Sequence, residues 1–113
     1  MINELVQRLS KGKHEVILED GNESYEDIKN RIENGFVHVK FTKTIGTGTE
    51  IGINVDLNST NIKDVDFNKK SGTLHIEGTT NLNYDPVRCI ADINLVNKKG
   101  KGFLKVIIEE NIK

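Results

Sequence analysis

The feature that most constrains the fold is the stretch 86–108, in which two apolar runs flank a short polar segment. The runs cover 87–96 and 103–108, and both are rich in Val, Ile and Leu. Apolar runs on either side of a polar segment that contains glycine are typical of a β-hairpin. We therefore predict two strands joined by a turn at 97–102, and we expect the other elements to pack around this hairpin.

The first strand of the hairpin alternates between an apolar row and a mixed row, as expected for a strand with one buried face. The apolar row consists of Val87, Cys89, Ala91, Ile93 and Leu95. The mixed row includes Arg88, Ile90 and Asp92. An apolar residue between two charged ones on an outward face suits a binding surface, so we predict that these three residues bind a ligand or a partner.

The second strand of the hairpin has apolar residues on both faces. One face has Phe103 and Ile107, and the other has Leu104, Val106 and Ile108. A strand that is apolar on both faces is normally covered on both. The rest of the sequence offers no obvious cover for the second face, so we predict that its three residues form an interface with a partner protein or a second copy.

Two segments near the start of the chain have the apolar spacing of short amphipathic helices. The first covers 2–11. The second begins at Ser24, which together with Asp27 resembles a capping box, and it ends at 34–35. A compact apolar run at 14–19 lies between them, and we predict that it forms a strand.

The rest of the chain reads as strands joined by short turns. Beyond the hairpin, the predicted strands lie at 36–43, 51–55, 65–67 and 73–77, the last with a possible extension to residue 83. Helices followed by a series of strands are typical of the α+β class. We therefore predict one domain over 1–113, with two N-terminal helices packed on one face of a curved antiparallel sheet. The five to six strands would form a meander, which strong curvature would turn into a partial barrel.

Strong curvature would place the outward polar residues of the strands on one concave surface. These residues are His38, Lys40, Asn54, Asp56, His75, Glu77, Arg88 and Asp92. From this set we predict that His38, His75 and Glu77 line a binding surface together with the mixed row of the hairpin.

No motif in the sequence has the spacing that catalysis or metal binding requires. The glycines of 46–48 precede a strand pattern, which favours a hairpin turn over a phosphate loop. His75 shares a strand face with Glu77, as two metal ligands would, but any two outward positions of a strand satisfy this spacing. The acidic pair at 64 and 66 lacks the further oxygen ligands of a calcium-binding loop. Cys89 lies in the apolar row and reads as a core thiol. We expect no catalytic residue, no cofactor and no metal.

Composition restricts the partners and the compartment. The net charge is −1, so no overall field attracts nucleic acid or an anionic membrane. No apolar run approaches the ~20 residues that span a bilayer, and the first residues lack the apolar segment of a secretory signal. A single cysteine fits a reducing compartment. We expect a cytoplasmic protein without membrane contact.

Two of the predicted turns are basic, at 69–70 and 98–101. If they project from the same end of the sheet, they form a local positive patch. Patches that bind nucleic acid usually add stacking aromatic residues, and the two nearby ones, Phe67 and Phe103, follow the pattern of core residues. We therefore interpret these lysines as solvated turn residues.

Three functions are compatible with these patterns. The first is a non-catalytic cytoplasmic module that binds protein, as an accessory, inhibitor or self-associating subunit. The second is a small-molecule-binding or enzymatic domain that uses the polar concave surface. The third and least favoured is a nucleic-acid-associated protein that acts through the lysine turns.

Overall fold

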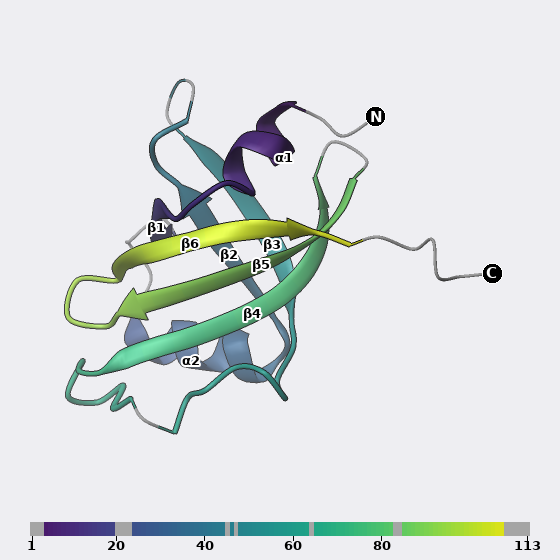
Figure 1. Ribbon diagram of the computed structural model, residues 1–113. Coiled ribbons are helices and arrows are strands. Elements are labelled where there is room, and N and C mark those ends of the chain that lie inside the picture. Colours follow the sequence, from purple (N-terminus) through teal and green to yellow (C-terminus); the bar gives the residue numbers. More distant parts are fainter. Residues whose placement is uncertain are drawn as a thin grey trace.

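The structure, a computed structural model, describes residues 4–19, 24–44, 46, 48–63, 65–82 and 85–107. Within these residues, six antiparallel strands form one sheet that closes into a barrel, accompanied by two helices (Figure 1). In chain order the elements are α1 (Glu4–Leu9), β1 (His14–Leu18), α2 (Tyr25–Glu33), β2 (Phe36–Phe41), β3 (Thr49–Val55), β4 (Thr73–Leu82), β5 (Asp85–Asn94) and β6 (Lys99–Val106). Each strand pairs with its neighbours in the chain, and β1 pairs with β6 to close the barrel.

The mixture of helices with an antiparallel sheet is as predicted, but the shape of the sheet and the place of the helices are not. The sheet is a closed barrel and not a curved open sheet. The helices do not form a layer on one sheet face, because α1 packs against β6 and α2 against β2, near the top and the bottom of Figure 1. A closed sheet encloses its own core, so each helix covers only part of it. The buried residues of the helices are Val6, Leu9, Ile28 and Ile32.

The inward row predicted for β5 is confirmed. The four residues on the strand and Leu95 just after it are at most 1% exposed. The other strands alternate in the same way, as Val37, Val39 and Phe41 of β2 illustrate. The inner face of the barrel is therefore the hydrophobic core, and polar residues lie on its outer face.

The turn of the central hairpin lies earlier than predicted. It occupies 95–98, so Gly100 and Gly102 belong to β6 and not to the turn. Gly100 pairs with Ile93 on β5. A Cβ atom on Gly100 would lie 1.8 Å from the carbonyl oxygen of Asp92, so the two strands approach each other more closely than a side chain would allow.

The barrel itself covers part of the predicted interface. Leu104 is 1% exposed and belongs to the core, and Val106 is partly buried against it. The prediction that a partner must cover Leu104 is wrong, because pairing with β1 closes the sheet over the inner face of β6. Ile108 lies outside the described residues. The outward residues of β6 are Lys99, Lys101, Phe103 and Lys105.

The predicted strand at 65–67 is also wrong. This segment is part of a loop in which Asp66 and Ser71 form an isolated bridge. The predicted hairpin partner of this segment, β4, instead pairs with β5 along its whole length. The extension of the strand beyond residue 77 is confirmed, since β4 runs to Leu82.

Candidate functional site

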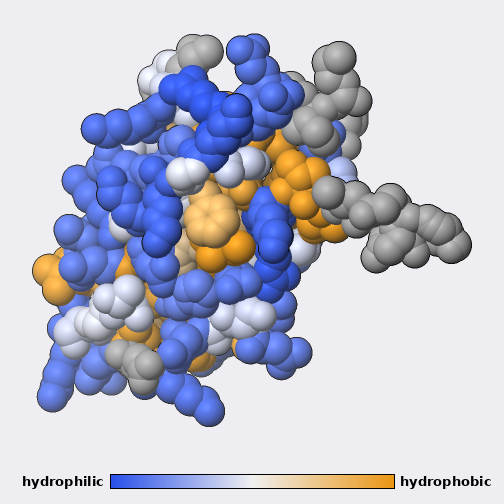
Figure 2. Space-filling model, viewed as in Figure 1, coloured by the Kyte–Doolittle hydropathy of each residue, from blue (hydrophilic) through white to orange (hydrophobic). Residues whose placement is uncertain are grey.

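Five of the six residues predicted to bind lie on the outside of the barrel, where β4, β5 and β6 are adjacent. We call this surface the outer face and define it by His75, Glu77, Arg88, Ile90, Asp92, Lys101, Phe103 and Lys105. In the strand register, Glu77 is opposite Ile90, and Ile90 is opposite Phe103. Figure 2 shows apolar residues surrounded by hydrophilic ones over β5 and β6, the strands at the front of Figure 1.

One half of the outer face is a continuous network of charged side chains. The ring of His75 bridges β4 and β5, because its Nδ1 lies 2.8 Å from Oδ1 of Asp92. Its Nε2 lies 2.7 Å from Oε2 of Glu77, the residue two positions further along β4. The strands set this geometry, since His75 is opposite Asp92 in the register of β4 with β5.

Arg88 extends the network to the segment that follows β3. Its Nε donates a 2.8 Å hydrogen bond to Glu77, and a terminal nitrogen donates a 2.7 Å bond to Asp56. The same segment is also joined to the backbone of β4, because the amide of Glu77 donates to the hydroxyl of Thr60. The network therefore holds the loop after β3 against the outer face.

The pKa values of His75, Glu77 and Asp56 move in the direction that favours the charged form of each group. Hydrogen bonds to Glu77 and then to Asp92 raise the pKa of His75. The bond to His75, followed by that to Arg88, lowers the pKa of Glu77, and the bond to Arg88 lowers that of Asp56. Ionised carboxylates only accept hydrogen bonds, so both ring nitrogens of His75 donate, as an imidazolium does.

This protonation state restricts the chemistry of the site. A ring whose two nitrogens both donate has no lone pair for a metal ion or for a substrate proton. In the part of the chain that the structure describes, no group of three His, Cys, Asp or Glu residues is placed to hold a metal ion. Cys89 is buried as predicted, and burial raises its pKa to about 12, so its thiol is not a ready nucleophile.

The structure brings together five of the six predicted binding residues, and the sixth lies elsewhere. His38 belongs to β2, where its ring meets that of Phe36 edge-on with centroids 5.2 Å apart. Its backbone amide donates to Glu19, a carboxylate that is only 4% exposed. The prediction of one concave surface that includes His38 is therefore wrong, because the outward side of a closed barrel is convex and β2 lies elsewhere around it.

The sequence did not indicate the roles of four residues at this site, Asp56, Lys101, Phe103 and Lys105. Asp56 was recognised as an outward residue, but its bond to Arg88 depends on how β3 and β4 are placed around the barrel. The outward row of Lys101, Phe103 and Lys105 was not predicted, because Gly100 and Gly102 indicated a turn and not a strand. The available signal was the alternation of lysine with smaller or apolar residues from Lys99 to Lys105.

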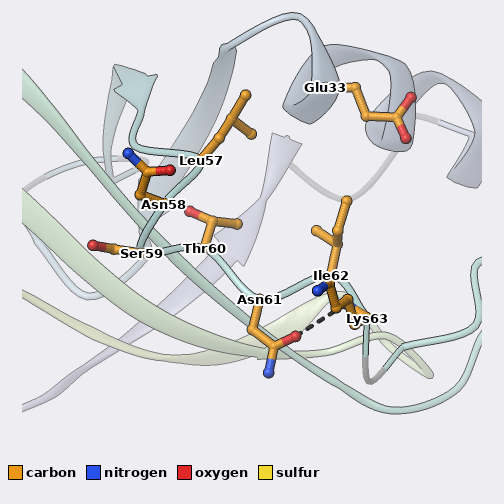
Figure 3. Close-up of a pocket in the computed structure, with 8 residues that line it drawn as sticks. All are labelled: Glu33, Leu57, Asn58, Ser59, Thr60, Asn61, Ile62 and Lys63. Carbon is orange, nitrogen blue, oxygen red and sulfur yellow. Dashed lines mark hydrogen bonds between the residues drawn. The ribbon is translucent and has the colours of Figure 1, made fainter.

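A separate cleft of about 640 Å³ lies beside the loop that the network anchors (Figure 3). Glu33 of α2 stands on one side of it, and the loop 57–63 supplies the remaining lining. The loop is shaped by its own side chains, since Asn61 accepts a hydrogen bond from the amide of Lys63. Leu57 is 52% exposed beside this cleft. The network residues do not line it, so it is not the polar pocket that the small-molecule alternative requires.

Neither protein-family models nor curated proteins match this chain. No helix within the described residues has the length and apolar character needed to cross a membrane.

Proposed function

We propose that the protein is a non-catalytic protein-binding module whose outer face binds a second copy of the same chain. The observation that carries the proposal is the half-buried apolar pair Ile90 and Phe103, which has the charged network beside Ile90 and two lysines beside Phe103 on β6. An apolar centre with a charged rim is the usual anatomy of a protein interface.

The two sides of the apolar pair differ in charge. The charged network on β4, β5 and the segment after β3 has three carboxylates, those of Asp56, Glu77 and Asp92, and two cations, Arg88 and His75. The β6 side has two exposed lysines, Lys101 and Lys105. Neither lysine takes part in an ion pair within the described residues. The face therefore has one side with excess carboxylate and one side with unpaired positive charge.

Such a face is complementary to itself. A two-fold axis parallel to the strands and between β5 and β6 would bring β5 of one copy opposite β6 of the other. Phe103 of each copy would then meet Ile90 of the other, and Asp92 would meet Lys101, because these residues are opposite each other in the register of β5 with β6. The network also holds its side chains in place before contact, which lowers the entropy lost on association.

Sedimentation velocity and light scattering over a concentration series test the proposal. The wild-type protein is expected to form a dimer that weakens at high salt, because the rim contacts are ionic. Phe103→Glu is expected to give a monomer, since it places a carboxylate in the apolar centre. Lys101→Glu is expected to weaken the dimer, because it places a carboxylate opposite Asp92 of the other copy. Val96→Glu is the matched control, because Val96 is 68% exposed but lies in the turn after β5.

Two results would refute the proposal. One is a wild-type protein that stays monomeric up to about 1 mM, which corresponds to an association free energy weaker than about −4 kcal/mol. The other is a dimer that Phe103→Glu leaves intact while the variant remains folded. Dissociation by Val96→Glu alone would assign the contact to the turn and would refute the outer face equally.

A further inference from the structure

His75 stands at one end of a row of alternating charges on the outside of the barrel. His75 is opposite Asp92 in the register of β4 with β5, and Asp92 is opposite Lys101 in the register of β5 with β6. Lys101 is in turn opposite Glu15 on β1. Asp92 therefore has a cationic neighbour on each side, yet among the described residues its carboxylate pairs only with the ring of His75, at 2.8 Å.

The pairing between His75 and Asp92 depends on the proton of the ring. The ring faces Asp92 through Nδ1 and Glu77 through Nε2, and only a protonated ring donates to both carboxylates. A neutral ring keeps one N–H, so one of the two carboxylates loses its donor. Glu77 also accepts a hydrogen bond from Arg88, at 2.8 Å, whereas Asp92 has no second donor in the part of the chain that the structure describes. A further cation would therefore stabilise Asp92 more than Glu77.

We propose that the dimer releases protons from His75 when it forms, so that association is favoured at high pH and weakened at low pH. The inference rests on the dimer proposed above, in which Lys101 of the second copy meets Asp92. The ammonium group of this lysine takes the place of the His75 proton at the carboxylate, and it repels a ring that is still protonated. Association also removes water from the face, which disfavours the charged ring. Both effects have the same sign.

The other charged groups around His75 do not reverse this sign. Among the described residues of its own copy, these groups are Glu77 on β4, Arg88 on β5, Lys99 and Lys105 on β6, and Asp56 and Lys63 in the segment after β3. They act on the ring both before and after association. Glu15 of the second copy would attract the protonated ring, but it lies on β1, which follows β6 around the convex barrel and is further from the contact. Its carboxylate already pairs with Lys43, at 3.5 Å.

A pH titration of the histidines by NMR tests the inference at the ring concerned. The imidazole signals are followed at one protein concentration well below the dissociation constant of the dimer and at one well above it. The pKa of His75 is expected to be lower at the high concentration, because the lysine of the second copy is present only in the dimer. His38 lies on β2, outside the outer face, and is the internal control. Its titration curve should be the same at both concentrations.

Sedimentation velocity supplies an independent measurement. The dissociation constant should fall about tenfold between about pH 5.5 and about pH 9, which is roughly threefold for each of the two rings in the dimer. His75→Gln keeps the carboxylates but has no proton to release, so it should bind with the high-pH affinity of the wild type at every pH. His38→Gln is the matched control and should retain the pH dependence of the wild type. Circular dichroism verifies that each variant is folded.

A dissociation constant that is the same at both ends of the pH range, or that rises with pH, would overturn the inference and leave the dimer intact. A pH dependence that His75→Gln retains or that His38→Gln removes would also overturn it, because the proton would then belong to another group. A wild-type protein that is monomeric at every pH would refute the dimer and this inference together. The two failures are distinguished by whether the protein associates as its concentration rises.

Discussion

Replacement of Ile93 by alanine tests the assignment of the inner face of β5 most directly. Ile93 is fully buried, and it lies between Leu74 on β4 and Gly100 on β6. The substitution removes three carbon atoms, which corresponds to about 2.4 kcal/mol of lost transfer free energy. Gly100 has no side chain that could move into the space, so a cavity should remain. We therefore expect a total loss of about 3 to 4 kcal/mol.

Urea denaturation followed by circular dichroism measures this loss, at one fixed protein concentration because association changes apparent stability. Ile93→Val should cost only about 1 kcal/mol, since it removes a single methylene. Val96→Ala is the surface control and should change stability by less than about 0.5 kcal/mol. A loss below about 1 kcal/mol for Ile93→Ala, with an unchanged denaturant slope, would show that Ile93 does not lie in the core.

Three further predictions concern the backbone, the network and the thiol. Gly100→Ala should lower the free energy of unfolding by about 3 kcal/mol in the same denaturation assay. The loss should exceed that of Gly102→Ala, because a Cβ atom at position 100 would meet the backbone of Asp92. A Cβ atom at position 102 would first meet the side chain of Ala91, at 3.0 Å. The raised pKa of His75 predicts that its contribution to stability is complete below about pH 6.5 and is lost as the pH rises through the higher pKa of the folded state. Stability measured from pH 5 to 9 should therefore fall more steeply for the wild type than for His75→Gln, and parallel curves would contradict the network. Cys89, with a pKa of about 12, should resist alkylation in the native protein and react once urea unfolds the protein. Mass spectrometry measures the extent of alkylation. Rapid alkylation of the native protein would disprove the burial of Cys89.

Local patterns predicted the parts of the fold that depend on one segment at a time. The alternation in 87–95 identified the buried row of β5, because successive side chains of a strand point to opposite faces. Ser24 was predicted to cap a helix, and its side chain accepts a hydrogen bond from the amide of Asp27. The same alternation identified Arg88, Ile90 and Asp92 as outward residues.

The sequence-based predictions were wrong where the environment of a residue depends on a segment that is distant in the chain. The glycines at 100 and 102 indicated a turn because turns are where glycine is most often required. Here they permit close approach of β6 to β5, which is a property of the pair of strands. Likewise, Leu104 looked uncovered in the sequence, and it is buried because β1 closes the barrel beside β6.

Composition and alternation specify which side chains the outer face has and on which strand face each of them lies. His75 and Glu77 share a face because they are two residues apart, and the lysines of both turns are evident from composition alone. Which of these groups meet depends on the closure of the barrel. Asp56 reaches Arg88, and Lys70 and Lys98 reach Tyr25, because closure of the barrel joins segments that are distant in the chain. Periodicity specifies the direction of a side chain, whereas register and closure are set by the packing of the whole core.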